Sequence, residues 1–82
     1  MPAKKLTEAQ RRVLTWLGKG WSSEPGSGSA ILVNGKRICN VDTMMALERM
    51  GLVEQLYYDG RLQVGQWKAT AEGRRLTAEL EL

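Results

Sequence analysis

The stretch that most constrains the fold is Asn40 to Val53, NVDTMMALERMGLV, which predicts one short helix running directly into a strand. Asn40 is a preferred N-cap residue, because its side-chain oxygen can accept a free backbone N–H of the first turn. Asp42 places a negative charge at the positive end of the helix dipole, and Arg49 places a positive charge at the other end. Gly51 can adopt the left-handed conformation that ends a helix. We therefore expect a helix with both ends marked.

A hairpin is predicted on either side of this helix. Residues 30–39, AILVNGKRIC, contain Asn34-Gly35, and residues 52–68 contain Asp59-Gly60. Both dipeptides suit a type I′ turn, because its two central positions need positive φ. In the second hairpin neither face is cleanly apolar, so either both faces are partly covered or a bulge at Gly65 shifts the register. Counting outward from the turns, the expected pairs are Val33 with Lys36, Ile31 with Ile38, Tyr58 with Arg61, Leu56 with Gln63 and Leu52 with Trp67.

Each end of the chain predicts one further helix. Thr7 and Gln10 match the capping box, and an apolar stripe at helical spacing follows as far as Gly18. Thr70 is a suitable N-cap for the last helix, and Gly73 near its start indicates close packing against a neighbouring element. The side chains expected to face the core are Leu6, Gln10, Val13, Leu14 and Leu17 in the first helix, and Leu76 and Leu80 in the last.

The segment between the first helix and the first hairpin has neither a helical nor a strand pattern. Ser22 to Ser29, SSEPGSGS, predicts a flexible polar loop, and a phosphate-binding loop is disfavoured because no Gly-Lys-Ser/Thr follows. Trp16 and Trp21 flank the end of the first helix. They could stack on nucleic-acid bases or pack over the helix end, and packing is the favoured interpretation.

The composition is that of one small soluble domain. The chain has 82 residues, of which 43% are hydrophobic and 26% charged. We expect residues 1–5 to form a basic flexible arm and residues 6–82 to form a single domain. There is no apolar run of about 18 residues and no signal-peptide pattern, so we expect a cytoplasmic protein without membrane contact. Residues 1–37 hold seven cations against two carboxylates, a charge of +5 that suits a phosphate backbone.

The residue inventory argues against an enzyme. The chain has no histidine, so it lacks a histidine general base, a Ser-His triad and the usual zinc-ligand sets. Cys39 is the single cysteine and is expected to be a buried, inert thiol. We therefore predict no catalytic residues, no metal, no cofactor and no small-molecule substrate.

The order helix, strand pair, helix, hairpin, helix is that of a winged helix, and two passages carry a more specific resemblance. Residues 46–53, ALERMGLV, resemble the passage from recognition helix into wing of small bacterial and phage-type winged helix-turn-helix proteins. Residues 67–76, WKATAEGRRL, are similar to their closing strand and helix, with Ala69 in place of the usual leucine. The resemblance implies an α+β, winged-helix-like fold of three helices and two β-hairpins. The second helix of the helix-turn-helix is expected to be degraded or missing, because a Gly/Ser loop and the first hairpin occupy its place.

Such a resemblance implies a nucleic-acid-binding module, for example a small transcriptional or phage regulator that contacts DNA through its wing and through the phosphate backbone. The central helix offers a poor base-reading surface, with one arginine, one carboxylate and two methionines facing outward. Arg61 follows the second turn, where it could enter a minor groove. The residues expected to contact DNA are Arg61, Lys36, Arg37, Arg49, Thr43, Lys4, Lys5, Arg11 and Arg12.

The alternative hypothesis is a protein-interaction module on the same scaffold. Met45 and Met50 lie on the outward side of the predicted central helix, and exposed methionines suit an adaptable protein contact. The module would then be a phage-type inhibitor of host machinery or a dimerising adaptor. Its partner would be another protein or a second copy of the chain.

Overall fold

A computed structural model describes residues 6–82 of the chain as a small α+β fold with three helices and two antiparallel sheets. The predicted α+β class, the three helices and both hairpins are therefore confirmed. The first sheet has the strand order β1-β2-β3, and the second consists of β4 and β5. In chain order the elements are α1 (Glu8–Leu17), β1 (Glu24–Pro25), β2 (Ala30–Val33), β3 (Lys36–Asn40), α2 (Val41–Arg49), β4 (Val53–Tyr58), β5 (Arg61–Ala69) and α3 (Ala71–Glu79).

The helix ends follow the local rules, with one exception. Thr7 and Gln10 form the predicted capping box at the start of α1, and the Thr70 side chain accepts a hydrogen bond from the backbone N–H of Gly73 in α3. Gly51 follows α2 with a φ of 79°, as expected for a left-handed stop. Asn40 occupies the N-cap position of α2, but its side chain makes no capping hydrogen bond. That part of the prediction was wrong, because an arginine of β3 competes for the same oxygen.

The core lies where the three helices meet the two sheets. Its fully buried members come from α1, the first hairpin, α2 and β4. The prediction for α3 needs correction, because Leu80 is only half-buried and Thr77, one turn after Gly73, is buried. A Cβ atom added at Gly73 would overlap the carbonyl oxygen of Leu52, which confirms the expected close packing. The core residues with the least exposure are Val13, Leu14, Leu17, Val33, Met44 and Leu47.

The first hairpin keeps its predicted turn but has one extra residue. Asn34 and Gly35 both have positive φ, and Val33 pairs with Lys36 as expected. Farther from the turn, Ile31 pairs with Cys39, so the predicted partnership of Ile31 and Ile38 was wrong. The register shifts there, and the extra residue on β3 lets two successive side chains of that strand reach the core.

The second hairpin contains a larger irregularity. Its turn and the pairing of Tyr58 with Arg61 are as predicted. Beyond the pair formed by Tyr57 and Leu62 the register shifts, so that Leu56 of β4 lies opposite four residues of β5, 63–66. The expected pairs of Leu56 with Gln63 and of Leu52 with Trp67 were therefore wrong. Gly65, with a φ of 80°, lies within this irregular segment, so a bulge at this glycine is the alternative that the structure adopts.

The predicted loop of residues 22–29 is partly ordered as a strand. Glu24 and Pro25 form β1, which pairs with β2, and Ser23 just before them is buried. The backbone N–H of Ser23 donates to the Trp67 carbonyl at 2.9 Å, and its hydroxyl accepts from the Trp67 N–H at 2.8 Å. The hydroxyl also donates to the Gly65 carbonyl at 3.1 Å. Ser23 thus joins the first sheet to the bulged strand of the second.

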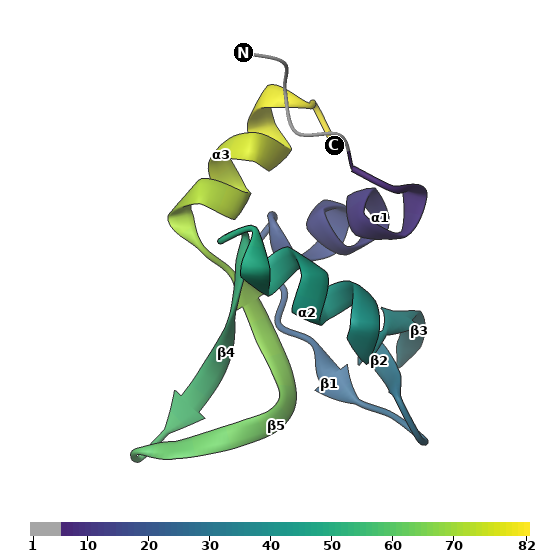
Figure 1. Cartoon of the computed structure of the whole chain (residues 1–82), viewed down its shortest axis with the longest axis vertical. Helices are drawn as coiled ribbons and strands as arrows, with labels where there is room; N and C mark the ends of the chain where they lie inside the picture. The colour runs from purple at the N-terminus through teal and green to yellow at the C-terminus, as the bar shows by residue number, and fades with distance from the viewer. Residues whose placement is uncertain (1–5) are drawn as a thin grey trace.

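The second hairpin and the loop between β1 and β2 project towards the same end of the molecule (Figure 1). The β4–β5 turn and this loop lie at one end of the longest axis, and α3 lies at the other. The Asn34-Gly35 turn of β2–β3 lies at the opposite end of the first sheet from this loop, beside Trp21 and Ser22. The molecule extends 36 Å along this axis and 25 Å and 20 Å across it. Helix α2 packs against both β3 and β4, so it lies between the bases of the two hairpins.

Replacing Ser23 by alanine should destabilise the fold. The variant leaves the Trp67 N–H and the Gly65 carbonyl without their side-chain partner, which should cost about 1–3 kcal/mol of unfolding free energy. Urea denaturation followed by circular dichroism measures the change. Ser22→Ala is the matched control, because Ser22 is exposed and its replacement should change the free energy by less than about 0.5 kcal/mol. Equal midpoints for Ser23→Ala and the parent protein would show that this link is not needed.

Candidate nucleic-acid interface

Two arginines from different elements meet beside the start of α2. Arg12 of α1 donates from Nη1 to the Ile38 carbonyl of β3 at 3.5 Å, a long and weak hydrogen bond. Arg37 of β3 donates from Nη2 to the Asn40 side-chain oxygen at 2.6 Å. Both arginines remain exposed, and both lie close enough to Cys39 for their charges to favour its thiolate. The fold therefore gathers two predicted DNA contacts that are 25 positions apart in the sequence.

Lys36 and Arg11 are exposed cations next in sequence to these two arginines. Lys36 is exposed and follows the Asn34-Gly35 turn directly, so it lies at the tip of the first hairpin. Arg11 is exposed on α1, next in sequence to Arg12. We call the set Arg11, Arg12, Lys36 and Arg37 the first basic cluster.

Arg61 lies apart from this cluster, at the tip of the second hairpin. It is exposed and directly opposite Tyr58, which is 76% exposed. The same hairpin exposes Tyr57, Leu62 and Val64, a set of apolar side chains that our sequence reasoning did not single out. The sequence did contain a sign of this exposed apolar set, because neither face of the second hairpin was cleanly apolar in the expected register.

The outward side of α2 offers few side chains that could read bases. Arg49 is exposed near the end of the helix, Thr43 is half-buried, and Asp42 is exposed in the first turn. Met45 is 47% exposed, as predicted for an outward residue. Met50 is half-buried and packs against the core, so the predicted methionine surface is reduced to one residue.

Within residues 6–82, neither the first basic cluster nor Arg61 forms an ion pair with a carboxylate. The one ion pair in this part of the chain joins Arg75 to Glu72 on α3, at the end of the long axis opposite the tip of the second hairpin. Lys4 and Lys5, the remaining predicted contacts, lie outside the described residues. The ion pair on α3 thus involves neither the first basic cluster nor Arg61.

Neither a metal centre nor a membrane-spanning helix is found in residues 6–82. No three histidine, cysteine, aspartate or glutamate side chains in this part of the chain group closely enough to hold a metal ion. None of the helices described there combines the length and the apolar character needed to cross a bilayer.

Comparisons of the chain with protein-family models, with curated proteins and with solved structures gave no significant match. The candidate interface therefore rests on the geometry and charge of its residues.

Cys39 should be unreactive in the native protein. Burial raises the pKa of its thiol to about 11, against the opposing effect of Arg37 and then of Arg12. At pH 8 the thiolate population, and with it the rate of alkylation by iodoacetamide, should be lower by about a hundredfold than in the urea-unfolded chain. Mass spectrometry of timed samples measures this ratio, and equal rates would contradict it. Since the folded pKa is raised, the associated stability should be complete below the unfolded pKa and decline as the pH rises towards 11.

Proposed function

We propose that this protein is a nucleic-acid-binding module that grips duplex DNA through its two hairpins and through phosphate contacts. The role would be that of a small transcriptional or phage regulator on a winged-helix-like scaffold. The observation that carries the proposal is the placement of two exposed arginines, Arg12 and Arg37, beside the start of α2, together with exposed Arg61 at the tip of the projecting second hairpin (Figure 1). A duplex would meet the first basic cluster and Arg61 at separate points along its backbone.

Phosphate contacts would supply most of the affinity. Arg12 and Arg37 hold their guanidinium groups beside the start of α2, where the positive end of the helix dipole adds to their field. The exposed part of α2 offers Arg49 for base or phosphate contact, but Asp42 repels phosphate. Sequence discrimination would therefore rest on DNA shape, with Arg61 entering a narrow minor groove.

A protein-interaction module is the second candidate, and the exposed apolar side chains favour it. Met45 is 47% exposed on α2, while Tyr57 and Val64 on the second hairpin are 66% and 75% exposed. A monomeric domain of this size has little need to leave such side chains in water. In this proposal α2 and the second hairpin would contact a partner, in the first instance a second copy of the chain, as in a dimerising adaptor.

The DNA proposal predicts a salt-dependent interaction that specific cations control. Lys36→Ala and Arg61→Ala should each weaken binding to a random 20-base-pair duplex and reduce the slope of log K against log salt by about 1. Fluorescence anisotropy at several salt concentrations measures both quantities.

Arg74→Ala is the matched control for these variants. Arg74 is an exposed arginine of α3, at the end of the molecule opposite the tip of the second hairpin. The Arg74→Ala variant removes one positive charge, as Arg61→Ala does, and should leave the affinity for DNA and the salt slope nearly unchanged. If Arg74→Ala lowered both as much as Arg61→Ala, the binding would reflect net charge alone, and the hairpin interface would be wrong.

The interaction candidate predicts a different set of results. If two chains associate through α2, Met45→Asp should shift the sedimentation equilibrium towards monomer and leave the melting temperature within a few degrees of the parent, because Met45 is outside the core. Met45→Leu keeps the apolar contact and should associate like the parent. A parent protein that stays monomeric at about 100 μM would contradict self-association. That concentration corresponds to a binding free energy of about −5.5 kcal/mol.

A further inference from the structure

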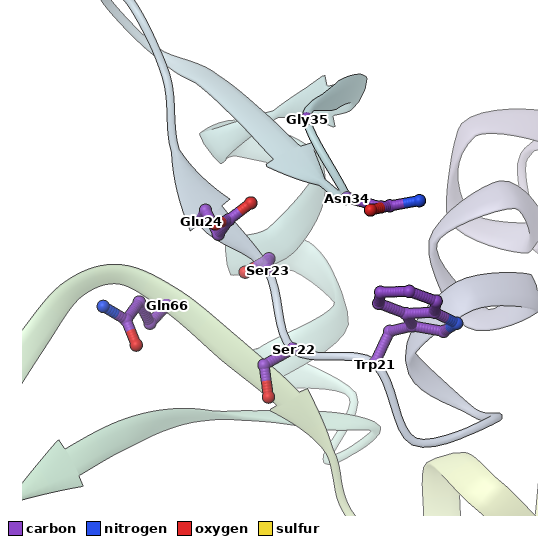
Figure 2. Close-up of a pocket in the computed structure, with 7 residues that line it drawn as sticks. All are labelled: Trp21, Ser22, Ser23, Glu24, Asn34, Gly35 and Gln66. Atoms are coloured by element: carbon purple, nitrogen blue, oxygen red, sulfur yellow. The ribbon is translucent and has the colours of Figure 1, made fainter.

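A polar hollow of about 520 Å³ opens beside the first hairpin, and none of the residues assigned to DNA lines it (Figure 2). Trp21 forms one side of it and Glu24 the other, with the Asn34-Gly35 turn between them and Gln66 of β5 beyond Glu24. Residues from three distant parts of the chain thus meet around one opening. Neither the fold nor the proposed DNA contacts account for the chemistry of this set.

Trp21 presents a fixed aromatic surface. Its ring meets that of Trp16 edge-on, with centroids 5.7 Å apart and an angle of 78° between the planes. Its backbone N–H also bonds to the Trp16 carbonyl at 3.4 Å. The side chain nevertheless remains 44% exposed, so part of the indole is open to a ligand in the hollow.

Glu24 is the one charged side chain that lines the hollow. It is exposed, and no residue of the range 6–82 forms an ion pair or a side-chain hydrogen bond with it. Its position is nevertheless well defined, because β1 pairs it with Leu32 and the buried Ser23 before it is bonded to β5. The carboxylate is therefore a held, unneutralised negative charge.

The remaining polar groups are the amide side chains of Asn34 and Gln66. Neither side chain is hydrogen-bonded to another group within residues 6–82, so their carbonyl oxygens remain available as acceptors. The hollow thus combines one carboxylate, two amide groups and an aromatic surface, with no cation among its lining residues. This charge balance favours a ligand that is positively charged and rich in N–H donors.

We propose that the hollow binds a guanidinium group, in the form of an arginine side chain. A guanidinium is planar, so it can stack on the Trp21 indole, and its paired N–H groups match a carboxylate such as that of Glu24. The amide oxygens of Asn34 or Gln66 would accept from the N–H groups left over. A lysine ammonium lacks the planar face and the paired donors, and should bind more weakly. A guanine nucleotide offers similar donors, but Glu24 would repel its phosphate.

Binding can be measured with N-acetyl-L-arginine amide as the probe, by titration into ¹⁵N-labelled protein. Chemical-shift changes should be largest at the Trp21 indole N–H, at Glu24 and at the Asn34 and Gln66 side-chain amides, with a Kd on the order of 1 mM. N-acetyl-L-lysine amide should shift the same signals with a weaker Kd. No localised shifts with the arginine probe, or equal affinity for the two probes, would overturn the proposal. Tighter binding of guanosine monophosphate at these signals would also overturn it, in favour of a nucleotide site.

Glu24→Gln and Trp21→Ala should each raise the Kd of the arginine probe by about tenfold. Glu54→Gln is the matched control, since Glu54 is an exposed carboxylate of β4 that does not line the hollow, and it should bind like the parent. Because Glu24 is on the surface, its variant should fold even if Trp21→Ala does not. An unchanged Kd for Glu24→Gln would contradict the proposal.

Two further comparisons define the source of the guanidinium and distinguish this proposal from that of DNA binding. A Gly-Arg-Gly peptide with blocked ends that binds at least as well as free arginine would identify a protein ligand, whereas preference for free arginine would identify a small molecule. In both cases the site binds a guanidinium. Glu24→Gln should not lower the affinity for duplex DNA, so failure of either proposal leaves the other intact.

Discussion

The structure depends most on the hydrogen bonds that Ser23 makes to the bulged strand β5. This buried residue satisfies the backbone N–H and the carbonyl of Trp67 and the carbonyl of Gly65, groups that an irregular ladder would otherwise leave unpaired. Gly65 contributes by having no side chain, since a Cβ atom there would press against Pro25 of β1. The two sheets are therefore joined at one point, and the base of the second hairpin is held against the first sheet.

The same link divides the second hairpin into a supported base and an unsupported tip. Near the base Val53, Trp67 and Ala69 are buried, whereas Tyr57 and Tyr58 near the tip are mostly exposed. A two-stranded ribbon without a third strand has little stability of its own, so its conformation at the tip rests on the Asp59-Gly60 turn. Such a tip can adapt to a ligand while its base keeps it in place, which suits a contact to DNA or to a protein partner.

Local chemistry made much of this fold predictable. The turns at Asn34-Gly35 and Asp59-Gly60, the helix caps and the stop at Gly51 depend on the preferences of a few adjacent residues. The strand registers were predictable only as far as the first irregularity, because a bulge is stabilised by partners elsewhere in the chain, here Ser23. Competition between partners set a second limit, since the Asn40 side chain bonds to Arg37 instead of capping its own helix.

The candidate sites show the same division between local and long-range information. Sequence identified the cations, but the meeting of Arg12 with Arg37 and the hollow between Trp21 and Glu24 depend on how distant elements pack. That packing also places the two proposed functions side by side, because Gly35 lines the hollow and Lys36 follows it at the hairpin tip. A guanidinium that neutralises Glu24 would reduce the repulsion of phosphate near that tip, to an extent that salt screens. Occupancy of the hollow and binding of DNA would then favour each other through charge, without any change of fold.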